Sequence, residues 1–302
     1  MLNLKNLFKN NGYCIYDQNL DIEVINKARL AFDSILKKSE NKIYKKVRVY
    51  DDYHFNKINI AGIENIFDKE IIHQDILDII NKSHIVNIAK SILEEEDIIL
   101  SLSRYHVTNN FTHLGIWHRD GEYNNLQSVQ INIYLYNETG MDIVPHSHTR
   151  KNFEHEDLII KSKPFSNLEN SSSVSVLSGK VLAFDPSLIH RGKTINNRVH
   201  LHFRFMKNNN LKKTIDNNLS LKFLDKFSIN QDLKNLLINT EKNGYNYESE
   251  EYSHNKNFKF TMLRIIRLFI HKFLFFLSYD NKIYLKFNTR PCLNMRRLFR
   301  LN

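Results

Sequence analysis

Two stretches of the chain alternate apolar and polar residues with the period of two that is typical of β-strands. In 127–136 one face is aliphatic and the other carries Gln, Asn and Tyr, and in 198–205 the polar face carries two arginines and two histidines. Half-buried strands normally turn such polar faces to solvent. We instead expect the apolar faces to pack outward on helices and the polar faces to line a barrel, because Arg198 and His190 would then reach one cavity.

Other segments show helical spacing or the composition of loops. Residues 6–40 predict a short strand around Tyr13–Tyr16 followed by a helix, and 70–95 predict further helix with an isoleucine-rich face. We expect these N-terminal helices to buttress the sheet. The other segments are expected to be irregular at 43–65, β-like at 97–107, a polar loop or lid at 149–172, helical at 218–240 and a linker at 242–257.

The charge of the chain is concentrated at its C-terminal end. Of its 43 Lys and Arg residues 11 lie from Lys256 onward, and of its 33 acidic residues only Asp280 does, so 1–255 holds 32 of each sign. The formal charge of +10 therefore belongs to a tail, and no nucleic-acid partner is expected. We divide the chain into a main domain (1–206), a helical extension with a linker (207–257) and a basic amphipathic tail (258–302).

The tail contains an amphipathic segment at 262–279, in which Arg264, Arg267 and His271 would share one helical stripe opposite an apolar face. This pattern predicts either a helix that packs on the domain or on a second copy, or an interfacial helix that brings 262–302 to a membrane. No secretory signal or apolar span is apparent, and two cysteines make no disulfide framework. We therefore expect a cytoplasmic protein, with peripheral membrane contact through the tail as the option left open.

The candidate chemistry lies in the stretch from Trp117 to Phe205. His118 and Asp120 are two residues apart, so in an extended strand their side chains project to the same side. His190 follows an apolar run and can supply a third ligand. Two histidines and one carboxylate on one face of a metal ion are typical of the facial triad of non-haem Fe(II) oxygenases.

Further motifs surround these three residues. The sequence reads Trp-His-Arg-Asp-Gly at 117–121, Pro-His-Ser-His at 145–148, His-Arg-Gly at 190–192 and then Arg198, and it opens with Asn-Asn-Gly-Tyr-Cys-Ile-Tyr at 10–16. In these motifs, over roughly residues 6 to 206, the chain resembles the phytanoyl-CoA dioxygenase family of Fe(II)/2-oxoglutarate oxygenases.

The resemblance implies an α+β, mainly β fold with a double-stranded β-helix (jelly-roll, cupin-like) core. It implies a dioxygenase that uses Fe(II), 2-oxoglutarate and O2 to hydroxylate a small or lipid- or glycan-linked metabolite. The metal ligands would be His118, Asp120 and His190, with no catalytic residue beyond them. Arg198 would pair with the far carboxylate of 2-oxoglutarate, with Arg204 in reserve, and Ser147 would bind the cosubstrate or simply close its turn.

One departure from the family concerns the turn at 145–148, where His146 stands in place of the family's Gly. If that position requires a positive φ, His146 is strained there, or it belongs to the substrate pocket. We expect His148, His200 and His202 to be pocket or turn histidines, and we assign Arg119 no role beyond the surface. Two alternatives stay open: a jelly-roll metalloenzyme that does not use 2-oxoglutarate, and a non-catalytic membrane-associated binding protein of the same fold.

Overall fold

The computed structural model of the chain describes residues 2–41, 49–54, 57–108, 117–162, 166–192, 198–208 and 221–243. The predicted tail at 258–302, most of the predicted linker and residues 109–116 lie outside these residues.

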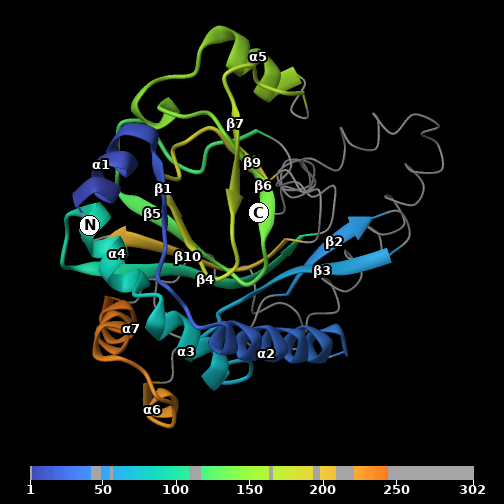
Figure 1. Ribbon diagram of the computed structural model, residues 1–302, viewed down its shortest axis with the longest axis vertical. Coiled ribbons are helices and arrows are strands. Elements are labelled where there is room, and N and C mark those ends of the chain that lie inside the picture. The colour runs from blue at the N-terminus through green and yellow to red at the C-terminus, as the bar shows by residue number, and fades with distance from the viewer. Residues whose placement is uncertain are drawn as a thin grey trace, which may run out of the picture.

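The described strands form two antiparallel sheets (Figure 1). The larger sheet has the order β1 (Tyr13–Tyr16), β8 (Val181–Phe184), β5 (Ser128–Tyr134), β10 (Arg198–Lys207), β4 (Ile98–Thr108), β3 (Lys57–Glu64) and β2 (Val49–His54). The smaller sheet has the order β7 (Ser172–Val176), β6 (Glu138–Ile143) and β9 (His190–Gly192). The two sheets face each other, because Leu182 and Phe184 of the larger one pack in one cluster with Met141 and Ile143 of the smaller one. This arrangement agrees with the predicted jelly-roll core.

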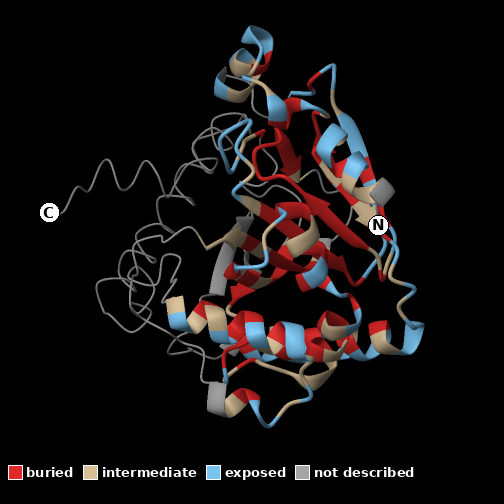
Figure 2. Cartoon of the chain, turned by 90° about the vertical axis from the view of Figure 1, so that its left-hand side faces the viewer, coloured by how far each residue is buried: buried red, intermediate tan, exposed pale blue. Residues whose placement is uncertain are grey.

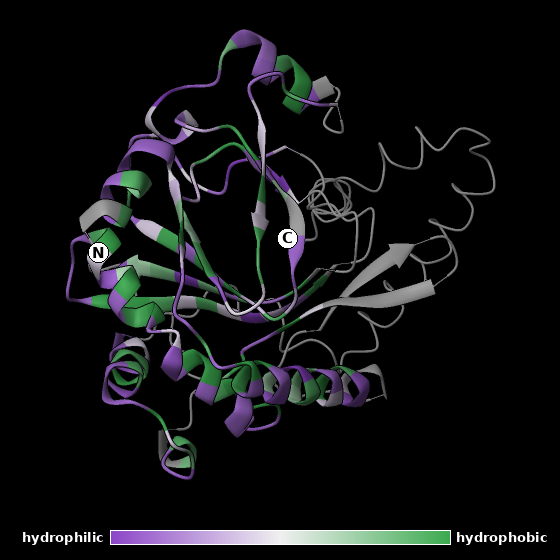
Figure 3. Cartoon of the chain, viewed as in Figure 1, coloured by the Kyte–Doolittle hydropathy of each residue, from purple (hydrophilic) through white to green (hydrophobic). Residues whose placement is uncertain are grey.

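Apolar and polar residues alternate along β5 and β10 (Figure 3), and both faces of these strands are buried. The apolar positions of both strands belong to the main hydrophobic core, where they pack with residues of the helices. The polar positions are buried too: Gln130 is 2%, Asn132 1%, His200 1% and His202 4% exposed. Because solvent does not cover the polar face, the prediction that it lines the interior is confirmed.

Helices cover the outer face of the larger sheet, with their polar sides exposed (Figures 1 and 2). They are α1 (Leu2–Asn11), α2 (Ile22–Asn41), α3 (Gln74–Lys82), α4 (Ile85–Leu93), α6 (Leu221–Leu224) and α7 (Gln231–Asn243). The segment predicted to be helical at 70–95 is divided between α3 and α4 at His84, whose φ of 50° is left-handed. Leu233, Leu236 and Leu237 of α7 belong to the main core, so the extension predicted at 207–257 shares that core with the main domain.

The polar segment at 149–172 is not loop throughout, because it contains α5 (Glu154–Ser162). Ile159 and Ile160 of this helix pack against a small cluster formed by Trp117, Val144, Leu168 and Ile189. Trp117 and Ile189 directly precede His118 and His190, so α5 supports the two histidines from outside the sheets. Among the described residues, the helices are all too short or too polar to cross a membrane.

Candidate metal centre

His118 and His190 lie opposite each other on two neighbouring backbone segments. Each donates its backbone N–H to the carbonyl of the other, both at 3.0 Å, which makes an isolated antiparallel bridge. Their rings come to 4.3 Å between centroids. Asp120 is fixed by its own backbone, since its N–H donates to the carbonyl of Pro186 at 2.8 Å. The ligand atoms of His118, Asp120 and His190 all lie within 4.8 Å of one another.

The orientation of His190 suits a metal ligand. Its Nδ1 lies 2.9 Å from the carbonyl oxygen of Leu188. Because a carbonyl can only accept, this contact places the proton of the neutral ring on Nδ1 and leaves Nε2 as the donor atom for a metal. His190 is 6% exposed, so the backbone holds this ligand in place largely away from water.

One oxygen of the Asp120 carboxylate accepts two hydrogen bonds, and the other faces His118. Oδ2 accepts from Gln130 Nε2 at 2.7 Å and from Arg204 Nη2 at 2.7 Å. Oδ1 faces His118, 3.8 Å from its Nε2. Burial opposes the ionisation of Asp120, but the fields of His118, Arg204 and His190 outweigh it and hold the pKa of this carboxyl well below its usual range.

These donors fit Fe(II). Two imidazole nitrogens and one carboxylate oxygen from one side of a site form the set that leaves the remaining positions of the ion open. The side chains of His118 and Asp120 are 26% and 32% exposed, so a cosubstrate can approach the centre from that side. Within the described residues, this is the one group of at least three His, Cys, Asp or Glu side chains close enough together to hold a metal. His148, His200 and His202 are thus not part of a second cluster.

Polar side chains continue from the candidate metal ligands into the interior. His200 stacks on His106 with 4.6 Å between ring centroids, and it lies 5.1 Å from the ring of Tyr134. Nδ1 of His200 is 3.6 Å from Glu138 of the opposite sheet. The buried Oδ1 of Asn132 has no hydrogen-bond partner among the described residues. A buried acceptor without a hydrogen-bond partner indicates that a water molecule or a polar ligand can bind in this interior.

Two alternatives were open for the turn at 145–148, and the contacts of His146 and Ser147 bear on both. His146 adopts a positive φ, of 63°, as the first alternative requires, and its Nδ1 lies 2.6 Å from the carbonyl oxygen of Asn10. Ser147 is fully buried; its Oγ donates to Val144 O at 2.6 Å and accepts from Ile189 N at 2.9 Å. This hydroxyl closes the turn and fixes the residue before His190, which leaves it no hydrogen for a cosubstrate.

The two candidate anchors of 2-oxoglutarate differ in position. Arg198 begins β10 and pairs with Thr108 of β4, and its side chain is outside the described part of the chain. Arg204 lies six residues further along the same strand, where its guanidinium binds Asp120. The alternation in the sequence placed Gln130 and Arg204 on the interior face but gave no signal that both would hold the Asp120 carboxylate.

Comparisons with known proteins support the fold. The chain matches no protein-family profile and no curated protein sequence. It is similar in structure to AviO1 from Streptomyces viridochromogenes Tue57, with 14% identity and a TM-score of 0.54 over 69% of this chain and 95% of that one. It is also similar to EctD from S. alaskensis, solved with 2-oxoglutarate and 5-hydroxyectoine, with 13% identity and a TM-score of 0.51 over 68% of this chain and 76% of that one.

A third similar structure is SnoK, a non-haem α-ketoglutarate-dependent carbocyclase from nogalamycin biosynthesis. Here the identity is 16% and the TM-score 0.51, over 68% of this chain and 84% of that one. At these identities the likeness establishes the fold, and the chemistry of this chain must be argued from its own residues.

Proposed function

We propose that this chain is an Fe(II)- and 2-oxoglutarate-dependent oxygenase that acts on a small molecule. The observation that carries the proposal is the convergence of His118, Asp120 and His190 within 4.8 Å of one another. The fold shared with EctD and SnoK supports the choice of metal and cosubstrate, since EctD was solved with 2-oxoglutarate and SnoK is a non-haem α-ketoglutarate-dependent carbocyclase. Hydroxylation of a small or lipid- or glycan-linked metabolite is the reaction we favour.

In this proposal the protein supplies geometry and the control of water. His118 and His190 bind as neutral imidazoles and Asp120 binds as a carboxylate through Oδ1, because Gln130 and Arg204 hold its Oδ2. Iron with 2-oxoglutarate supplies the activation of O2, and the coproducts are succinate and CO2. The side chains behind the ligands exclude solvent from that side, as the 1% exposure of Trp117 indicates.

Arg198 is the cosubstrate anchor in this proposal. A carboxylate buried in the interior needs a cation with a planar fork, and Arg204 already binds Asp120 at 2.7 Å. A charge-assisted hydrogen bond contributes about 1.5–3 kcal/mol, so Arg198→Ala should raise the KM for 2-oxoglutarate about ten- to a hundredfold or more while the Kd for iron changes much less. If Arg204→Ala produces that selective loss and Arg198→Ala does not, the anchor is Arg204.

The test of the proposed function is the release of succinate from 2-oxoglutarate. Purified protein would be incubated aerobically with Fe(II) and 2-oxoglutarate, with and without candidate metabolites, and succinate would be quantified. We expect succinate above the protein-free control, stimulation by a substrate, and loss of both in His190→Ala. Succinate at the background level with iron-loaded protein and every candidate would refute the use of 2-oxoglutarate.

A further inference from the structure

Arg119 stands between two proposed metal ligands in the sequence, and its side chain joins the backbone segments around them. Nε donates to Asn152 Oδ1 at 2.7 Å, Nη2 donates to the carbonyl of Arg150 at 3.2 Å, and Nη1 donates to the carbonyl of Ser147 at 2.7 Å. A fourth hydrogen bond runs from Nη1 to the carbonyl of Ser187. A surface role, as the sequence suggested, does not account for four hydrogen bonds to acceptors on two other segments.

One of these acceptors bears directly on a ligand. Ser187 immediately precedes Leu188, whose carbonyl orients the His190 ring through Nδ1 at 2.9 Å. The turn at 185–188 is also the one that accepts the backbone N–H of Asp120, through Pro186 O at 2.8 Å. Arg119 therefore ties the backbone segment that carries two of the proposed ligands to the turn that orients the third.

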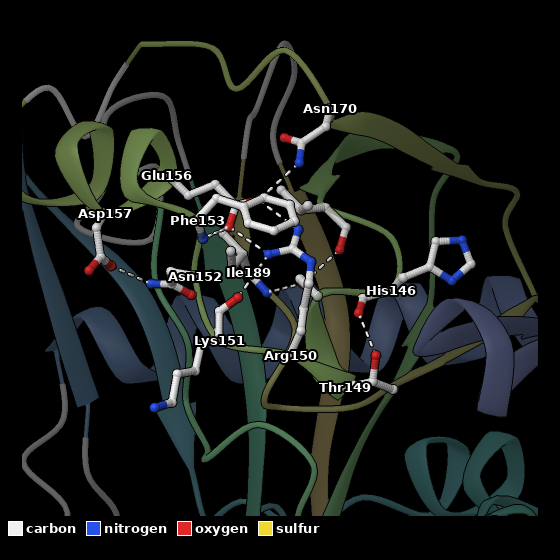
Figure 4. Close-up of polar contacts among 12 residues, drawn as sticks. His146, Thr149, Arg150, Lys151, Asn152, Phe153, Glu156, Asp157, Asn170 and Ile189 are labelled. Carbon is white, nitrogen blue, oxygen red and sulfur yellow. Dashed lines mark hydrogen bonds and ion pairs between the residues drawn. The ribbon is translucent and has the colours of Figure 1, made fainter.

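Two other acceptors of Arg119, the Arg150 carbonyl and Asn152, lie on a segment held by several polar contacts (Figure 4). The Arg150 guanidinium makes two hydrogen bonds of 2.8 Å to Glu156, which is fully buried and also accepts from Asn170 at 2.9 Å. The same guanidinium lies 3.7 Å from the ring centre of Phe153. This segment, which directly precedes α5, carries the Arg150 carbonyl and Asn152, so the guanidinium of Arg119 is bound from it as well as from the two turns.

We infer that Arg119 is a positioning residue of the metal centre, which sets the spacing of His118 and Asp120 relative to His190. The inference rests on the proposed metal site and adds to it a residue that touches no ligand atom of the metal. Only a guanidinium has the planar set of donors that this arrangement uses. Lys has one nitrogen and could keep at most the two carbonyl contacts that Nη1 makes.

The test compares anaerobic Co(II) binding and the Co(II) absorption spectrum among variants of the full chain. Outer-shell partners typically contribute 10–100-fold to metal affinity, so Arg119→Met should raise the Kd for Co(II) by about that factor and change the d–d bands. Arg119→Lys should fall between Arg119→Met and the wild type.

The matched control is Arg29→Met, which also removes an arginine with three hydrogen bonds, to Leu135 O, Asn26 and Ser178, away from the ligands. It should lower the unfolding midpoint and leave the Co(II) affinity and spectrum unchanged. If Arg119→Met does not fold, two milder variants replace it in the comparison with Arg29→Met. They are Arg119→Lys, and Asn152→Ala, which removes one acceptor of Arg119.

The inference is overturned if the foldable Arg119 variants bind Co(II) with wild-type affinity and spectrum, or if Arg29→Met alters both as strongly. Failure of the proposed function is a different result, in which the wild type itself binds no metal or releases no succinate.

Discussion

The ion pair between Asp142 of β6 and Arg191 of β9 gives a prediction whose size follows from its burial. The two residues are neighbours in the sheet register and are 3% and 4% exposed. Asp142 Oδ2 lies 3.0 Å from Arg191 Nε and 2.9 Å from Nη2, and the guanidinium lies 4.4 Å from the Trp117 ring. Asp142→Ala leaves the guanidinium buried without its carboxylate, and such breakage costs about 3–5 kcal/mol.

The assay is urea denaturation followed by circular dichroism on the wild type, Asp142→Ala, Arg191→Met and the double variant. We expect Asp142→Ala to lower the free energy of unfolding by about 3–5 kcal/mol, or the Tm by roughly 6–20 °C for a domain of this size. The double variant should lose less than the sum of the single variants, because it leaves no unpaired charge. Additive losses within about 0.5 kcal/mol would show that the two charges do not stabilise each other and would refute the reasoning.

Three further predictions concern other parts of the chain. Ser147→Ala removes the hydroxyl that bonds Val144 and Ile189, so it should lower unfolding free energy by about 1–3 kcal/mol in urea denaturation and leave the KM for 2-oxoglutarate unchanged. Burial opposes the ionisation of Glu156, but hydrogen bonds from Arg150 and Asn170 lower its pKa to about 2. The stability that this pair contributes is therefore present above the unfolded pKa of about 4.3, and it is lost as pH falls toward 2. Glu156→Gln should flatten that part of the acid-unfolding curve. If the tail at 262–302 contacts membranes, anionic liposomes should float the full chain at low salt and leave a chain ending at residue 255 behind, since each basic residue near the surface contributes about 1 kcal/mol.

The sequence predicts what depends on local patterns. The period-two alternation of β5 and β10 predicts which residues face the helices and which face the interior, because the pleat of a strand fixes both faces. The spacing of His118 and Asp120 likewise predicts that they point to the same side. The break between α3 and α4 was not predictable, because His84 adopts a left-handed conformation that the apolar periodicity does not signal.

The sequence does not predict pairings between distant residues. Arg204 reaches Asp120 across 84 positions, and Arg119 reaches Ser187 across 68. The first pairing joins Asp120 to an arginine that the sequence offered for the cosubstrate, and the second joins the turn at 185–188 to a residue that the sequence assigned to the surface. Both depend on how the turns meet around the bridge between His118 and His190.

The central claim is that His118, Asp120 and His190 bind one Fe(II) that 2-oxoglutarate then chelates. The most direct measurement is an anaerobic titration of the purified chain with Fe(II) and 2-oxoglutarate, followed by visible absorption and iron content. We expect one iron per chain and a weak charge-transfer band that needs both additions, with iron lost in Asp120→Ala and in His190→Ala. If each of these two variants keeps the iron content of the wild type, the assignment of the metal centre is wrong.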